Sequence, residues 1–180
     1  MCSCGLRGGY AEVVNMDPDV MAMTKKALSA KLCSTVLGQT VMECVVNPPK
    51  TGEESYEQFA SEKAERLKSL AQRAEMVQEA FNSIDGITCN PVMGAMYAFP
   101  RLHLPKKAIE AAKAKNQQPD FFYAWDMLEN TGICVIPGSG FGQKDGTHHF
   151  RTTILPQVDK LKSMVERFKA HHIKFMTKYS

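Results

Sequence analysis

The sequence contains no run of apolar residues that approaches the roughly 20 needed for a membrane-spanning helix. It also has little net charge, +3 over 180 residues. Lysines and acids are interleaved along the chain, and no basic stripe carries regularly spaced aromatic residues. We therefore expect neither membrane nor nucleic acid among the partners of this protein. The length and the 44% of hydrophobic residues suit a globular piece with a core of its own.

The dense cysteine spacing of a disulfide scaffold is also lacking. The six cysteines are scattered, and none forms a CxxC motif, so reduced thiols in a reducing compartment are expected. The sequence Cys2-Ser3-Cys4 has too few further ligands nearby for tetrahedral zinc, and no metal is predicted. Met1 is not followed by a basic and then apolar leader. Cytoplasm and mitochondrial matrix remain as alternative locations.

An arginine, Arg151, stands in the run 149–155, a short way past the glycine-rich stretch 137–142. The β-branched and apolar neighbours predict a strand. A guanidinium buried on such a strand needs an anion, and its planar fork of donors matches the two oxygens of a carboxylate. The alternative interpretation is a surface or structural ion pair.

A second arginine, Arg7, lies between glycines in the sequence Cys4-Gly5-Leu6-Arg7-Gly8-Gly9-Tyr10. Glycine on both sides lets the backbone approach a ligand closely, and an arginine at such a place can hold a phosphate. The motif is weak when taken alone. The two arginines together are a sharper signal, because one suits a phosphate and the other a carboxylate.

The spacing of apolar residues and turn signals predicts an α/β chain. An N-cap at Asp17 begins a helix that ends near residue 34, and Gly38 separates it from a second helix that stops before the prolines at 48 and 49. A capping box begins one long helix, of about seven turns, that ends near residues 85–86. Further helices are expected at 106–115, 119–130 and from Val158 onward, and strands at 11–16, 86–89, 95–99, 133–136 and 150–155. These elements predict a small sheet packed by helices.

Six segments carry a resemblance to a known family: GLRGGY at 5–10, VVNPP at 45–49, GEES at 52–55, GAMYAFP at 94–100, GICVIPGSGFG at 132–142 and HFRTTILP at 149–156. The chain resembles the C-terminal part of the fold-type I aminotransferases that use pyridoxal 5'-phosphate, most closely those specific for alanine. The resemblance implies the tail of the large cofactor-binding domain at 1–50, a long interdomain helix at 51–85 and the small C-terminal domain at 86–180.

The resemblance also implies roles. Arg7 matches the arginine that holds the cofactor phosphate, and Arg151 matches the arginine that grips the substrate α-carboxylate. The Schiff-base lysine would fall upstream of Met1, so no catalytic residue is assigned within the chain, and the isolated chain is expected to be inactive. The implied reaction exchanges an amino group between L-alanine and 2-oxoglutarate, in an enzyme that is expected to be a homodimer.

Two alternatives stay open. One is a non-catalytic, truncated aminotransferase-like chain that acts through dimerisation, and the other is an aminotransferase with a different amino-acid specificity. Two local interpretations accompany them: the 138–142 turn shapes one wall of the substrate pocket or is a plain turn, and Tyr97 belongs to the core. Without the remainder of a large domain, the apolar face made by Val13, Val20, Leu28 and Leu32 is expected to be exposed.

Overall fold

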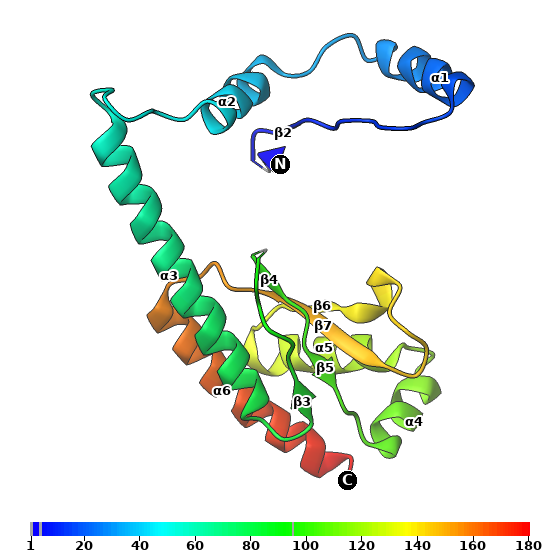
Figure 1. Cartoon of the computed structure of the whole chain (residues 1–180). Coiled ribbons are helices and arrows are strands. Elements are labelled where there is room, and N and C mark those ends of the chain that lie inside the picture. Colours follow the sequence, from blue (N-terminus) through cyan, green and yellow to red (C-terminus); the bar gives the residue numbers. More distant parts are fainter. Residues whose placement is uncertain (1, 4, 95) are drawn as a thin grey trace. The chain divides into compact units, whose positions relative to one another are not determined.

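The computed structural model of the chain describes residues 2, 3, 5–94 and 96–180. Met1, Cys4 and Ala95, which enter the interpretations above, lie outside the described residues. The chain divides into two compact units, Met1–Ser61 and Glu62–Ser180 (Figure 1). The boundary between the units falls within helix α3 (Tyr56–Asn82).

The first unit pairs two very short strands and adds two helices. Strands β1 (Cys2–Ser3) and β2 (Gly8–Gly9) are antiparallel. Helix α1 (Pro18–Ser29) begins where the sequence predicts, because the Asp17 carboxylate accepts hydrogen bonds from the amides of Asp19 and Val20 at 2.9 and 3.2 Å. Helix α2 (Val36–Val46) ends ahead of the two prolines, as expected.

Three expectations for the first unit are wrong. Residues 11–16 form no strand, since a strand needs a neighbouring ladder and none of the described segments pairs with them. Helix α1 ends at Ser29, and Leu32 then adopts a left-handed backbone with φ 63°. The break between the helices therefore precedes Gly38, which lies inside α2.

Gly38 has a packing role instead of a breaking one. A Cβ atom on Gly8 would lie 2.6 Å from the Gly38 carbonyl oxygen and 2.8 Å from its Cα atom, closer than real Cβ contacts come. The two glycines thus let strand β2 lie directly on helix α2. This contact explains why Gly38 is the buried residue of its helix.

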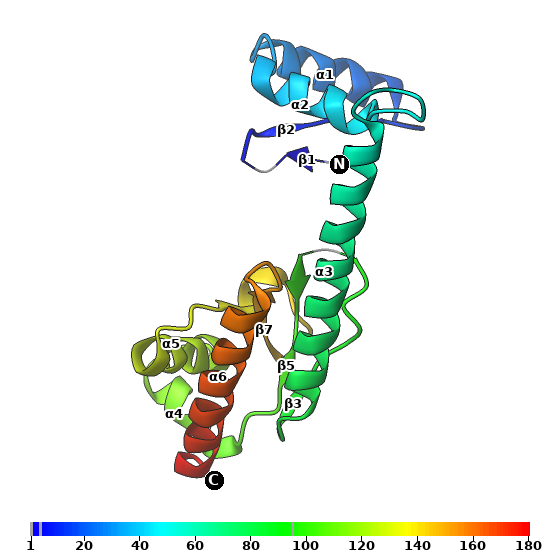
Figure 2. The same ribbon diagram turned by 90° about the vertical axis from the view of Figure 1, so that its left-hand side faces the viewer.

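The long helix α3 (Tyr56–Asn82) is confirmed at 27 residues. Its C-terminal half contributes Ala74, Val77 and Phe81 to the core of the second unit. The Phe81 ring lies edge-on to Phe168 at 5.2 Å between centroids, and this contact joins α3 to α6 (Val158–Lys178). Both helices are labelled in Figure 2. Leu67, nearer the start of the helix, is exposed.

The sheet of the second unit is antiparallel and is built around β7 (His148–Thr153). Strands β4 (Tyr97–Ala98) and β5 (Arg101–Leu102) pair with β7 in one continuous register, Tyr97 opposite Thr153 and Leu102 opposite His148. Strand β6 (Ile136–Pro137) also pairs with β7, and β3 (Ile87–Thr88) pairs with β5. Strand β5 is absent from the sequence expectations, since Pro100 and the short run around it mask the strand signal.

Helices α4 (Lys106–Ala114), α5 (Pro119–Thr131) and α6 complete the second unit and confirm the expected helical segments. Its core is aromatic, with Phe81, Phe150 and Phe168 in mutual contact. Tyr123 lies beside this cluster, and its hydroxyl is 2.8 Å from His172 Nδ1. The architecture is the expected small sheet packed by helices.

Candidate substrate and cofactor sites

Arg151 lies on β7 next to the fully buried Phe150, so its side chain belongs to the opposite face of the sheet. Its guanidinium carbon lies 4.5 Å from the centre of the Tyr97 ring and 4.7 Å from that of Phe141. The sequence predicted a buried side chain for Arg151, whereas the structure shows it half-buried. Within the described residues no acid forms an ion pair with it.

Aromatic residues surround this guanidinium on the same face. The Phe99 ring meets Phe141 edge-on at 5.7 Å and stacks on His149 at 4.9 Å with an interplanar angle of 6°. Tyr97 is 43% exposed, so the interpretation of Tyr97 as core is wrong. The inward positions of this segment belong to Ala98 and Pro100, both buried, and alternation turns Tyr97 and Phe99 the other way.

This arrangement leaves Arg151 able to bind a carboxylate. A ring that contacts the face of a guanidinium uses none of its N–H donors, because the donors lie in the plane of the group. Two rings lie close to this cation, and within the described residues no acid is paired with its donors. The prediction that Arg151 binds an anion has a structural setting that fits it.

The glycine-rich segment after β6 forms a short 3₁₀ turn, Gly138–Phe141, which ends at Gly142 with φ 66°. A left-handed residue here favours glycine. The turn supplies Phe141 and thereby contacts Arg151. Of the two interpretations given for this segment, the wall beside the arginine agrees with the contact.

A groove of about 350 Å³ lies beside these rings and is lined by Asn90, Met93, Gly94, Tyr97, Phe99 and His149 among others. Burial lowers the pKa of His149 from its ordinary value, and the nearby Arg101 lowers it further. Burial lowers the pKa of His148 too. From the sequence, His148 and His149 are interpreted as a solvated or hydrogen-bonded pair and not as part of this site, and the 90–94 loop was missed. The available signal was the position of His149 two residues before Arg151 in the strand.

Arg7 lies in the first unit, at a turn where its own φ is 54°. It lines a cavity of about 330 Å³ with Gly8, Gly9, Gln39 and Glu43 among others. No acid of the described chain is paired with it. A free guanidinium beside two glycine backbones suits a phosphate, which accepts hydrogen bonds from side-chain and backbone N–H groups.

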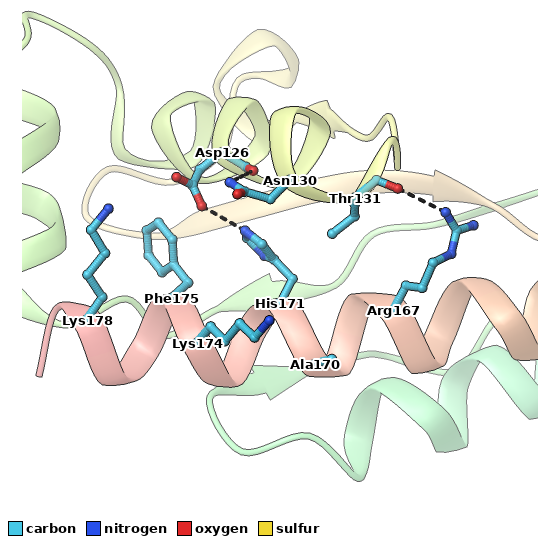
Figure 3. A pocket seen from close by; sticks show the side chains of 9 residues that line it. All are labelled: Asp126, Asn130, Thr131, Arg167, Ala170, His171, Lys174, Phe175 and Lys178. Carbon is cyan, nitrogen blue, oxygen red and sulfur yellow. Dashed lines mark hydrogen bonds and ion pairs between the residues drawn. The ribbon is translucent and has the colours of Figure 1, made fainter.

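A third cavity, of about 480 Å³, lies between α5 and α6 (Figure 3). His171 Nε2 donates to Asp126 at 2.7 Å, and Arg167 donates to the Thr131 carbonyl at 2.9 Å. The sequence alone leaves His171 and His172 as metal ligands or as a solvated or hydrogen-bonded pair, with the second interpretation preferred. The hydrogen-bonded interpretation is confirmed, since His172 in turn contacts Tyr123 and the Asp85 carbonyl. The described residues contain no group of three potential metal ligands.

Among the described residues, none of the helices has the length and apolar character needed to cross a membrane. The described cysteine side chains, Cys33, Cys44, Cys89 and Cys134, are free thiols. Burial raises the pKa of Cys89 above its ordinary value, which makes this thiol less reactive.

Comparison with solved structures defines the class of fold. The chain superposes on an alanine aminotransferase from Pyrococcus furiosus with a TM-score of 0.62, 26% identity and coverage of 89% of this chain and 34% of the other. An aminotransferase from Escherichia coli gives a TM-score of 0.60 at 22% identity, over 90% of this chain and 35% of that one, and shows the fold alone. The fold is that of the fold-type I aminotransferases.

Comparison of sequences narrows the relationship. The chain is 57% identical over its whole length to alanine aminotransferase 2 from Xenopus laevis and 49% identical to alanine aminotransferase 1 from Homo sapiens. It spans 33% and 36% of these relatives, about a third of their length. No protein-family model matches the chain. The chain is thus similar, from end to end, to part of the alanine aminotransferases.

Proposed function

We propose that this chain is part of an alanine transaminase, which exchanges the amino group of L-alanine with 2-oxoglutarate to give pyruvate and L-glutamate. The observation that carries the proposal is Arg151, a cation without an acid partner in the described structure, whose guanidinium carbon lies 4.5 and 4.7 Å from the centres of the Tyr97 and Phe141 rings. The similarity to alanine aminotransferases along the whole chain supports it.

Arg151 would bind the α-carboxylate that amino-acid and oxo-acid substrates share. Two parallel hydrogen bonds to one carboxylate fix both its position and its plane. A substrate held in this way presents its Cα–H bond in one direction, and orientation of this kind supplies rate by removing rotational freedom before the reaction. The rings of Tyr97 and Phe141, which lie close to the guanidinium, would help to keep it in place.

Arg7 would hold the phosphate of pyridoxal 5'-phosphate, with the backbone of Gly8 and Gly9 beside it. When bound, the cofactor supplies the electron sink for the bond that breaks at the substrate Cα. The residues present fit the phosphate, since Arg7 forms no ion pair with an acid of the described chain, although Glu43 lines the same cavity. The glycines permit close approach, because they carry no side chain.

The domain organisation follows from the same proposal. Residues 1–50 would be the tail of the large cofactor-binding domain, 51–85 the interdomain helix and 86–180 the small domain. We further propose a homodimer, located in the cytoplasm or the mitochondrial matrix. Sedimentation of the native protein and fractionation of its source would test these two points.

The direct test is an assay of the native, full-length protein for pyruvate formation. Pyruvate should appear only when L-alanine, 2-oxoglutarate and pyridoxal 5'-phosphate are all present. A panel of other amino acids at equal concentration tests the alternative specificity, and a higher kcat/KM for any of them would replace alanine as the substrate. Absence of transamination with every amino acid would refute the proposal.

The 180-residue chain taken alone is proposed to be inactive, in line with its coverage of about a third of its relatives. Pyruvate formation by this purified chain would contradict that statement. The non-catalytic alternative gains support only if the chain is found as such in its source and binds a full-length relative, which co-purification would reveal.

A further inference from the structure

A buried carboxylate lies under the turn that carries Phe141. Asp120, in the first turn of α5, is 0% exposed. Its Oδ1 atom accepts from the Phe121 amide at 3.0 Å, and its Oδ2 atom accepts from the Ser139 amide at 2.6 Å and from Gln143 Nε2 at 3.0 Å. A charge without access to water needs such donors, and here two of the three come from the turn 138–143.

The Asp120 carboxylate determines the orientation of the Gln143 amide and, through it, the tautomer of His149. An ionised carboxylate only accepts hydrogen bonds, so Gln143 must direct its amide nitrogen to Asp120 and its oxygen away. That oxygen, Oε1, lies 3.0 Å from Nδ1 of His149. Because Oε1 only accepts, the proton of the neutral His149 ring is on Nδ1. The tautomer of His149 is therefore set by Asp120 through Gln143.

The hydrogen-bonded series from Asp120 through Gln143 to His149 is called the relay here, and Gly138 makes room for it. A Cβ atom at this position would lie 2.8 Å from the Cβ atom of His149 and would collide with Oε1 of Gln143. The glycine is thus required where the turn, the glutamine and the histidine meet.

The relay ends at the substrate arginine by two routes. Through Gln143 it fixes the His149 ring, which stacks on Phe99, and Phe99 in turn meets Phe141. Through Ser139 it holds the turn that contains Phe141 itself. Both routes reach the ring that lies 4.7 Å from the guanidinium of Arg151.

We propose that Asp120 is a positioning residue for substrate binding: its buried carboxylate, through Ser139 and Gln143, orders Phe141 and His149 and so holds Arg151 ready for the α-carboxylate. This inference rests on the proposed role of Arg151. Asp120 itself touches neither substrate nor cofactor in this account. Its effect is confined to the geometry of the arginine and to the proton position on His149.

The test compares three variants of the native, full-length protein. In Asp120→Asn, one amide group replaces an acceptor, so at least one of the three donors loses its partner. Gln143→Ala removes the route to His149 together with one of the three donors to Asp120, and leaves the Ser139 and Phe121 amides in place. Glu129→Gln removes a charge from an exposed position of the same helix and serves as the control.

Two readouts are needed, the kinetics and the ¹⁵N NMR spectrum of the histidine rings, with the His149 signals assigned by His149→Asn. We expect Asp120→Asn to raise KM for alanine and for 2-oxoglutarate by about tenfold with kcat changed less than about threefold. The Nδ1–H form of His149 should become mixed with the Nε2–H form in both relay variants. The control should match the wild type.

Unchanged KM values together with an unchanged His149 tautomer in the relay variants would overturn the inference. If Asp120→Asn does not fold, Gln143→Ala decides the point, since it leaves Asp120 bonded to Ser139 and Phe121. If the wild-type protein shows no transamination, the proposed function fails. The NMR readout then still reports whether Asp120 sets the His149 tautomer.

Discussion

The two units of the chain differ in how they use apolar residues. In the second unit, large side chains such as Phe81, Phe150 and Phe168 are fully buried and touch one another. In the first unit, Gly38 is the one buried residue among those described from 5 to 61. Leu28 and Leu32 of this unit are 64% and 91% exposed.

The apolar face expected to be exposed in the first unit is confirmed, since Val13 and Val20 are exposed as well. A unit whose helices bury none of their large side chains gains little from the hydrophobic effect within the described structure. The second unit has a complete core. The site around Arg151 therefore lies on a unit with a hydrophobic core of its own. The site around Arg7 lies on a segment whose exposed apolar residues suit packing against another apolar surface.

Truncation of a large apolar side chain should show the largest difference in stability between the two units. We expect Phe81→Ala to lower the free energy of unfolding of the second unit by about 3–5 kcal/mol, because the ring is fully buried among other rings. Leu28→Ala, a truncation in α1, should change stability by less than about 0.5 kcal/mol. Urea unfolding followed by tryptophan fluorescence and circular dichroism measures both. Equal losses for the two variants would show that the units do not differ as described.

The glycine contact of the first unit offers a smaller effect. Gly8→Ala should lower the free energy of local opening of α2 by about 1–3 kcal/mol, so that this helix opens more often. The reason is that the added Cβ meets backbone atoms of Gly38 at 2.6–2.9 Å. Gly5→Ala is the matched control, because a Cβ there meets nothing within 4 Å. Hydrogen exchange resolved by mass spectrometry reports opening of α2 and of the second unit separately. Unchanged exchange in α2 for Gly8→Ala would contradict the close packing of β2 on this helix.

The smallest effect concerns pH and belongs to the second unit. Burial lowers the pKa of His172 below its ordinary value of 6.5, although the Asp85 carbonyl raises it and the neighbouring His171 lowers it further. The unfolded state thus binds more protons than the folded state, so this contribution to stability is present above pH 6.5 and is lost as pH falls through the folded-state value.

We expect the Tm of the second unit to decrease when the pH is lowered from 7.5 to 5.5. The decrease should be smaller in His172→Gln. Glutamine can accept from Tyr123 and donate to the Asp85 carbonyl without titrating. His148 and His149, whose pKa values are also lowered, leave a residual slope in the variant. Calorimetry at both pH values gives the comparison. An identical dependence of Tm on pH in the wild type and the variant would show that His172 does not cause the loss of stability.

The helices of the second unit could be predicted from the sequence, because caps, prolines and apolar spacing agree along them. Pro119 begins α5 and Gly132 ends it with φ 70°, as such signals indicate. The first unit was less predictable. The run at 11–16 has the composition of a strand, but a strand also needs a hydrogen-bonding neighbour, which local sequence does not contain.

The site could be predicted in part. Arg151 and Arg7 were found from their glycine and strand surroundings, and their binding roles remain proposals. The rings of Tyr97 and Phe141 around Arg151 could not be found, because strand register and a turn bring them together from distant positions. Asp120 was missed for the same reason, since its partners lie 19 and 23 positions further along the chain.

The most direct test of the central claim is the steady-state kinetics of Arg151→Lys in the native, full-length protein. Arg101→Lys, a like change at an exposed position of the same sheet, is the control. A lysine cannot form the bidentate pair, so KM should rise for both alanine and 2-oxoglutarate, by on the order of 100-fold, while the control stays near wild type. A change for only one substrate, or for neither, would contradict the assignment of Arg151 to the shared α-carboxylate.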